Sequence, residues 1–404
     1  MKELLNNKTF VIFWLSQSIS QIGNTFHLIA LPLWVLDLTN SAFQTGLVAT
    51  LELISGLVFA LFGGILSDRL NQKVLICISD FVRGTLVVSL IFINDPSQIW
   101  FVYLIAIASG MMTSLFVPAQ TAIIQYIVKK EDYSKANSLV MLTRSIAMIL
   151  GPIIGGIVVQ FFSFKGTFCI NASSYLIGVI GALLIKYTQI KKDLEIKRSI
   201  ITEIQDSFQL IRKNSELKIL FISVFAVFLG TGANGTLFIL HLTKNGVSPD
   251  GIGFYMATQG FGMILASLLF IKVFKEISKI KLVLFFSNII LGITLIIFIQ
   301  TSPFYFLISL IALFLFGLTL TFFTVSFQTI LQTATPSTFI GKISGLLRII
   351  TTSATGISIL LGTTLCSITS AKNVVTIFGL IVTLTTFWCI PLVIDSKRNQ
   401  EIDV

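Results

Sequence analysis

Residues 43–93 read FQTGLVATLELISGLVFALFGGILSDRLNQKVLICISDFVRGTLVVSLIFI, and this stretch decides the fold of the chain. Two long apolar runs, 43–66 and 74–93, are separated by one short polar loop that holds three charged residues. A helix needs roughly 20 apolar residues to cross the ~30 Å hydrocarbon layer of a membrane. Both runs reach that length, so the stretch predicts two membrane-spanning helices joined by a tight loop.

The same alternation of apolar runs and short polar loops continues through the chain of 404 residues. Hydrophobic residues make up 54% of it and charged residues only 11%, whereas soluble proteins average about 25% charged residues. The sequence therefore predicts an all-α, polytopic membrane protein. Its twelve expected membrane-spanning helices are 10–34, 43–66, 74–93, 99–127, 137–162, 166–187, 219–240, 251–271, 282–300, 304–331, 343–367 and 373–393.

The net charge of +10 is a property that nucleic-acid-binding proteins also have, but the position of the charge argues against that partner. Of the 28 Lys and Arg residues, 22 lie in the two termini and in the loops on the same side, and only 3 lie in the opposite loops. Basic loops of membrane proteins stay in the cytoplasm. We therefore expect both termini in the cytoplasm, a cell-membrane location and contact with membrane lipid.

The longest connection separates six expected helices from six. This division predicts an N-terminal six-helix bundle over 1–187, a cytoplasmic linker over 188–218 and a C-terminal six-helix bundle over 219–404. Apolar residues at helical spacing between Ile200 and Ile211 predict an amphipathic helix on the inner membrane surface. The alternative for this connection is a solvated tether, which its basic first part favours.

The two halves of the chain echo each other. The stretch FVPAQTAII over 116–124 and the stretch VSFQTIL over 325–331 each end a long apolar run. Each is followed by a helix that carries an arginine, Arg144 or Arg348. Internal repetition of this kind is typical of secondary transporters, whose substrate site lies near the membrane midplane between the repeats.

The loop sequence GILSDRLNQK over 64–73 carries the first motif. Gly64 allows a tight helix end, and Asp68 can accept hydrogen bonds from the free N–H groups at the next helix start, so a helix cap is one interpretation. The loop also resembles G-x-L-x-D-R-x-G-R-R/K, the signature of the major facilitator superfamily. The resemblance implies that the aspartate latches onto the cytoplasmic end of the eleventh helix. The matching residues are Gly64, Leu66, Asp68, Arg69 and Lys73, whereas Asn71 and Gln72 depart from the signature.

The second motif is AMILGPIIGG over 147–156. Pro152 removes a backbone donor and predicts a kink, and Gly151 and Gly155 predict a face on which a neighbouring helix approaches closely. Helix packing alone is one explanation of this pattern. The stretch is also similar to the antiporter motif G-x-x-x-G-P-x-x-G-G of the family's drug:proton exporters, which implies export. The residues Gly151, Pro152, Gly155 and Gly156 match that motif, and Ala147 replaces its first glycine.

Further stretches resemble the macrolide-efflux-type branch of these drug antiporters. They are 16–23, 116–119, 136–139 and 341–343. Many relatives carry an acid where this chain has Asn24, so the resemblance transfers no coupling residue to that position. Asn24 is instead a candidate for the wall of the substrate cavity.

Six ionisable residues lie within the expected spans, where each is costly unless it is paired or hydrated. They are His27, Glu52, Asp80, Arg83, Arg144 and Arg348. Asp80 and Arg83 are three residues apart and therefore share one helix face, on which they can pair. We interpret Asp80, Arg83, Arg144 and Arg348 as a structural or gating network, with a substrate contact as the alternative.

Glu52 lies at mid-depth in its span and has no basic residue within one turn. Removal from water favours the neutral form of a carboxyl group, so Glu52 is the first candidate for a proton carrier and His27 the second. Both are also candidate residues of the substrate cavity. The alternatives are a permanently neutral, hydrogen-bonded Glu52 or one at the outer mouth, and a His27 that serves only in packing.

Several functions are excluded by what the sequence lacks. It has no G-x-x-x-x-G-K-[ST] phosphate loop, and two histidines are too few for a catalytic or metal cluster. The four cysteines lie inside apolar runs without paired or metal-ligand spacing, so we expect buried thiols. No enzymatic activity, metal or cofactor is expected.

These observations and the resemblance together lead to one expected function. It is proton-coupled efflux of lipophilic small molecules such as macrolide-like drugs, by a monomeric secondary transporter of a bacterial cell membrane with a role in antibiotic resistance. One alternative is a dedicated exporter of a self-made metabolite, such as a peptide antibiotic or a siderophore. Another is a non-transporting membrane sensor or lipid-handling protein on the same scaffold. The sequence identifies neither the substrate nor the stoichiometry of coupling.

Overall fold

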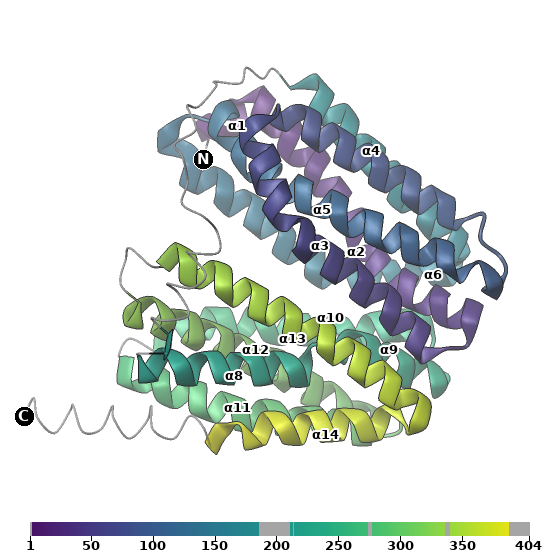
Figure 1. The fold of residues 1–404 in the computed structure, drawn as a ribbon, viewed down its shortest axis with the longest axis vertical. Helices are drawn as coiled ribbons and strands as arrows, with labels where there is room; N and C mark the ends of the chain where they lie inside the picture. The colour runs from purple at the N-terminus through teal and green to yellow at the C-terminus, as the bar shows by residue number, and fades with distance from the viewer. Residues whose placement is uncertain (1, 186–210, 213, 274–276, 336–339, 388–404) are drawn as a thin grey trace, which may run out of the picture. The chain divides into compact units, whose positions relative to one another are not determined.

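The computed structural model describes residues 2–185, 211–212, 214–273, 277–335 and 340–387. Within these ranges every regular element is helical (Figure 1). The long helices of the first half are α2 (Lys8–Thr39), α3 (Ala42–Arg69), α4 (Gln72–Leu90), α5 (Ile99–Ile127) and α6 (Tyr133–Leu184). Those of the second half are α8 (Ser215–Thr231), α9 (Asn234–Lys244), α10 (Pro249–Val273), α11 (Ile277–Thr301), α12 (Phe306–Ala334), α13 (Ile340–Ile368) and α14 (Ala371–Leu384). The described residues also form three short helices, α1 (Lys2–Asn6), η1 (Pro96–Gln98) and η2 (Lys130–Asp132).

Each of the twelve predicted runs corresponds to helix. The runs 137–162 and 166–187 both fall within α6, which is interrupted at Ser163 by left-handed backbone angles of φ 61° and ψ 175°. The run 219–240 is divided between α8 and α9. Nine helical segments of the described residues are long and apolar enough to cross a membrane. The other two runs correspond to α4, which contains three charged residues, and to α14, whose described helix has 14 residues.

The chain divides into two compact units. The first unit comprises Met1–Leu194 and Val247–Ala257, and the second comprises Glu195–Gly246 and Thr258–Val404. The start of α10 therefore groups with the first unit, although the sequence assigns it to the C-terminal bundle. The predicted linker 188–218 lies mostly outside the described residues, so its boundaries and its amphipathic helix stay predictions.

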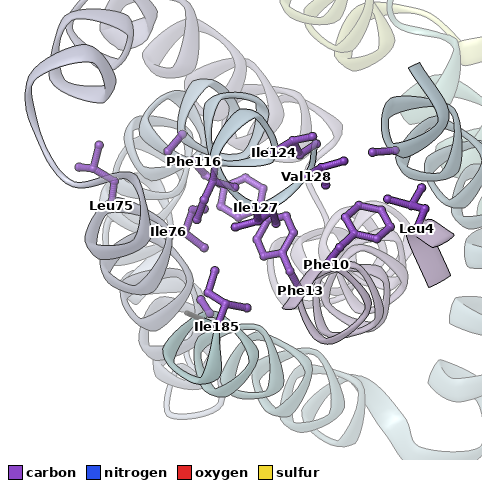
Figure 2. Packing of buried hydrophobic residues seen from close by; sticks show 14 residues of the cluster. Leu4, Phe10, Phe13, Leu75, Ile76, Phe116, Ile124, Ile127, Val128 and Ile185 are labelled. Carbon is purple, nitrogen blue, oxygen red and sulfur yellow. The ribbon is translucent and has the colours of Figure 1, made fainter. Parts of the chain in front are cut away.

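In the first unit, α2 packs along α6, α3 packs along α5, and α4 packs against α5 and α6. Figure 2 shows apolar side chains from α2, α4 and α5 directed toward a common interior at one end of these helices. Asn7 fixes this end, because its side chain accepts from Phe10 N and donates to Ile127 O at 2.8 Å. The labelled residues of the cluster are Leu4, Phe10, Phe13, Leu75, Ile76, Phe116, Ile124, Ile127, Val128 and Ile185.

In the second unit, α11 packs against α12 and α14, and α8 packs against α13 and α14. Phe238 of α9 contacts Phe298 and Phe316, with ring centroids 4.4 and 6.4 Å away. Gly262 and Gly317 allow close approach of α10 and α12, because a Cβ at either position would collide with backbone of the other helix. Small residues at such contacts are typical of helix packing in membranes.

The expectation of buried thiols is wrong for the described cysteines. Cys169 is exposed, and Cys77 and Cys366 are only partly buried. Many large apolar side chains on the same helices are also exposed, for example Leu104 and Leu268 at 55% and 59%. In a membrane protein an apolar run faces lipid as readily as protein, so hydrophobicity alone does not predict burial inside the fold.

Candidate functional site

Glu52 and His27, the two proton-carrier candidates, line the same small cavity in the first unit. Ser109 of α5 donates a hydrogen bond of 3.1 Å to Glu52 Oε1. His27 on α2 interacts electrostatically with Glu52 on α3, and its Nδ1 is buried without a hydrogen-bond partner among the described residues. The cavity volume is about 10 Å³, which is the size that holds one water molecule.

The sequence interpretation of Glu52 as an isolated acid is therefore corrected. No basic residue lies within a turn of Glu52 along α3, but α2 packs against α3 and brings His27 to the same cavity. A carboxyl, an imidazole and room for one water molecule form a group that can accept and release a proton. The remaining cavity walls are apolar, formed by Leu31, Val48, Leu86, Val87, Leu90, Val102, Ile105 and Ala106.

Asp80 and Arg83 form the ion pair that their spacing predicts, with 2.5 Å between Asp80 Oδ1 and Arg83 Nη2. Both side chains are buried, and Gln17 of α2 donates to Asp80 Oδ2 at 3.2 Å. The guanidinium also contacts the rings of Phe116 and Tyr175, whose centroids lie 4.2 and 4.8 Å from its carbon. Four helices of one unit thus meet at this pair, an arrangement that favours the structural interpretation over a gate.

Tyr175 connects this ion pair to Asn24. Its hydroxyl donates a hydrogen bond of 2.7 Å to Asn24 Oδ1, and the same ring contacts Arg83. Sequence analysis missed Gln17, Ser109 and Tyr175. A polar residue in an otherwise apolar run is the signal that could have identified Gln17, whereas the roles of Ser109 and Tyr175 depend on partners on other helices.

The glycine motif of α6 packs on two sides. A side chain at Gly151 would collide with the Thr25 hydroxyl of α2, and a Cβ at Gly155 would lie 3.1 Å from Phe26 Cα. On the other side, a Cβ at Gly156 would collide with Pro249 O at the start of α10. The close helix approach expected at this motif is therefore present within the first unit.

The interruption of α6 lies in the predicted connection between the runs 137–162 and 166–187 and is separate from the kink expected at Pro152, which stays a prediction. The helix continues through Pro152, and its residue with non-helical angles is Ser163, eleven positions further along. The carbonyl of Pro152 also packs closely on α10, because a Cβ at Gly253 would lie 2.5 Å from that oxygen.

In the motif over 64–73, the structure describes side chains only at the C-terminal end, residues 70–73. Lys73 Nζ donates to the carbonyls of Leu183 and Ile185 at 2.7 and 3.0 Å, and so binds the end of α6. The residue that caps α4 is Asn71, whose side chain accepts from Lys73 N at 3.0 Å, so the interpretation of Asp68 as this cap is corrected. Gly64, Asp68 and Arg69 belong to α3, but the surroundings of Gly64 and the side chains of Asp68 and Arg69 are not described, so the latch stays a prediction.

Arg144 and Arg348 each line a cavity in a different unit. Arg144 is half-buried beside Gln21 and Gln120 in a cavity of about 20 Å³. Arg348 is exposed on α13 and lines a groove of about 600 Å³. Arg144 shares its cavity with Gln17, which donates to Asp80 Oδ2, so three of the four charged residues of the predicted network gather in the first unit. Arg348 belongs to the second unit, and its part in the network stays a prediction. In the described part of the chain, no group of three or more His, Cys, Asp or Glu residues is placed to hold a metal ion.

Comparison with known proteins identifies relatives over nearly the whole chain. A family described as "Major Facilitator Superfamily" matches residues 13–219 and 220–402. Macrolide efflux protein A of Streptococcus pyogenes is 19% identical, over 83% of this chain and 84% of its own. The enterobactin exporter EntS of Shigella boydii is 29% identical, over 38% of each chain. The solved structure of the nucleoside transporter NupG has the same fold, with a TM-score of 0.80 at 15% identity, over 95% of this chain and 98% of its own.

Proposed function

This chain belongs to the major facilitator superfamily, and from that premise we propose that it exports lipophilic small molecules, such as macrolide-like drugs, in exchange for protons. The exporter is a monomer in a bacterial cell membrane, with both termini in the cytoplasm. Alternating access requires its two units to move against each other around a substrate site.

The observation that carries the export proposal is the packing of the glycine motif over 147–156. This stretch resembles the antiporter motif of the family's exporters, and its glycines are where α6 meets α2 and the start of α10. Any side chain larger than glycine would separate these helices. The glycines are therefore suited to a contact at which α6 moves against its neighbours during transport. The similarity to macrolide efflux protein A, over most of both chains, supports the same direction of transport.

The coupling part of the proposal depends on Glu52 and His27. In this account Glu52 is protonated from outside, and it releases the proton when the cavity opens to the cytoplasm. His27 stabilises the ionised carboxylate during release, since the two side chains interact across the same cavity. Ser109 holds the Glu52 carboxyl in position through its hydrogen bond.

A dedicated exporter of a self-made metabolite is the second candidate function. It is favoured by the 29% identity with the enterobactin exporter EntS over 38% of this chain, which exceeds the identity with macrolide efflux protein A. The two candidates share fold, direction and coupling, and they differ only in cargo.

Drug accumulation in a pump-deficient bacterial host tests the proposed function. Expression of the chain is expected to lower the cellular level of at least one macrolide, dye or quinolone, and an uncoupler is expected to restore it. A Gly155→Leu variant, expressed to the same level in the membrane, is the matched inactive control. Unchanged accumulation of every compound would reject drug export and leave the dedicated exporter as the surviving candidate.

A further inference from the structure

A groove of about 600 Å³ lies on the second unit between α8, α12 and α13. Its floor is apolar: Phe228 of α8 and Leu347 of α13 are half-buried there, above the buried side chains of Val224, Phe323 and Phe327. Pockets for drug-sized molecules have volumes of roughly 300–1,000 Å³ and are mostly apolar with a few polar groups. The groove is therefore of a size and character that fits one organic molecule.

Two polar edges flank this floor. Thr324 and Gln328, four residues apart on α12, form one edge, and both are exposed. Ser344 and Arg348, four residues apart on α13, form the other edge and are exposed as well. Residues at this spacing share one face of a helix. Each helix thus presents a polar stripe to the groove. Among the described lining residues of the groove, the Arg348 guanidinium is the one charged group.

The positive charge of Arg348 is not balanced by the protein in the part of the second unit that the structure describes. No acidic residue belongs to the described lining of the groove. The one described acid of this unit, Glu216, is already paired with Lys281 at 2.8 Å. An arginine keeps its charge at all physiological pH values. Within a membrane such a charge calls for a hydrated site or an anionic partner.

We propose that this groove binds an amphipathic organic anion as cargo. The apolar body of the molecule lies on the phenylalanine floor, and its carboxylate, sulfonate or phosphate accepts hydrogen bonds from the Arg348 guanidinium. Gln328 on the opposite edge supplies a further donor. The proposed occupant is a soluble cargo molecule rather than a membrane phospholipid, because the groove has the volume of a drug-sized ligand. The role of this anion as transported cargo rests on the proposed function, whereas its binding to the groove does not.

Two fluorescent probes that differ by one charged group test the proposal. They are 8-anilinonaphthalene-1-sulfonate and its uncharged parent N-phenyl-1-naphthylamine. Both are titrated onto the purified full chain in phosphatidylcholine nanodiscs, and the signal of empty nanodiscs is subtracted. Arg348→Gln is expected to raise the Kd of the sulfonate about tenfold and to change that of the parent less than twofold, with Arg348→Lys intermediate. Lys372→Gln, which removes an exposed cation outside the groove, is the matched control and is expected to change neither.

A second variant tests the floor. Phe228→Ala is expected to weaken both probes by a similar factor, since it removes apolar contact and no charge. The midpoint of thermal unfolding of each variant shows whether it is folded, and Arg348 is exposed, so its replacement is expected to leave that midpoint unchanged.

Two results would overturn the proposal. One is equal sulfonate affinity in the wild type and Arg348→Gln. The other is loss of sulfonate binding in nanodiscs that contain phosphatidylglycerol, which would assign the groove to anionic lipid. The titration uses no ion gradient, so its failure leaves drug export untouched. Conversely, a failure of the accumulation assay leaves the anion site standing.

Discussion

At the scale of single residues, the first unit holds a buried ion pair, Asp80–Arg83, and a half-buried carboxyl group, Glu52, whose charges are compensated to different degrees. The Asp80–Arg83 pair is satisfied by an ion pair, by Gln17 and by two aromatic rings. Glu52 has one hydroxyl donor, a neighbouring imidazole and space for a water molecule. A fully satisfied pair stabilises one arrangement, whereas a partly satisfied carboxyl can change its protonation state. This difference supports our proposal of a structural role for the first group and proton exchange for the second.

Glu52→Gln is expected to abolish the effect of a pH gradient on drug uptake into everted vesicles, because an amide cannot ionise. Binding of neutral drugs and exchange between them are expected to persist. Glu52→Asp, one methylene shorter, keeps an ionisable group and is expected to retain partial coupling. A Glu52→Gln protein that responds to the gradient like the wild type would place coupling elsewhere and make His27 the next residue to test.

Asp80→Asn and Arg83→Met are each expected to destabilise the fold by about 3–5 kcal/mol, because each leaves a buried charge without its partner. The double variant is expected to lose less than the sum of the two, since it leaves no unpaired charge. Unfolding of the purified protein in mixed micelles measures all three variants. Single variants that lose less than about 1 kcal/mol would mean that water reaches the pair.

The sequence predicted the Asp80–Arg83 pair and not the relation of Glu52 to His27, for a physical reason. Residues three apart on a helix meet whatever the tertiary structure is. Glu52 and His27 lie on different helices, and only the packing of α2 against α3 brings them to one cavity. The same reason explains why Tyr175 was missed, since its partner Asn24 is 151 positions away.

At the scale of the helices, each predicted apolar run corresponds to helix in the described residues, because a run of about 20 apolar residues is what a bilayer selects. The interruption of α6 at Ser163 falls in the predicted connection between the runs 137–162 and 166–187, so run length did predict it. The run 219–240 did not predict the division between α8 and α9, although residues 230–236 read GTGANGT and are rich in residues that interrupt helices. Local backbone geometry of this kind depends on which neighbours supply hydrogen bonds, and that information is tertiary.

Gly155→Leu is expected to abolish transport while the protein still inserts into the membrane. A Cβ at this position would lie 3.1 Å from Phe26 Cα, and backbone cannot move aside as a side chain can. Overpacking of this kind costs about 1–3 kcal/mol. The matched control is Gly235→Leu in α9, where nothing lies within 4 Å of the added Cβ. Membrane yield and drug accumulation are measured for both, and a fully active Gly155→Leu protein would show that this contact is dispensable.

At the scale of the whole molecule, export requires a closed cytoplasmic gate in part of the cycle. The family signature implies that Asp68 forms this gate as a latch. Asp68→Asn is expected to express normally, to transport poorly, and to raise the labelling of cytoplasmic-side cysteines introduced into the cavity. The described arrangement at Lys73 already fixes one end of the loop to α6, so the variant is expected to keep its thermal stability. Full transport by Asp68→Asn would show that no latch operates at this residue.

Uptake of a lipophilic fluorescent dye into everted vesicles tests proton-coupled export most directly. In these vesicles an exporter moves dye into the lumen while protons leave it, so an acidic lumen is expected to accelerate uptake. Vesicles without the protein and vesicles with Glu52→Gln correct for passive trapping of a basic dye in an acidic lumen. Proton-coupled export predicts uptake of the dye above both controls, and this uptake is expected to stop when an uncoupler removes the pH gradient. Uptake equal to that of empty vesicles, or uptake above them that ignores the gradient, would contradict it.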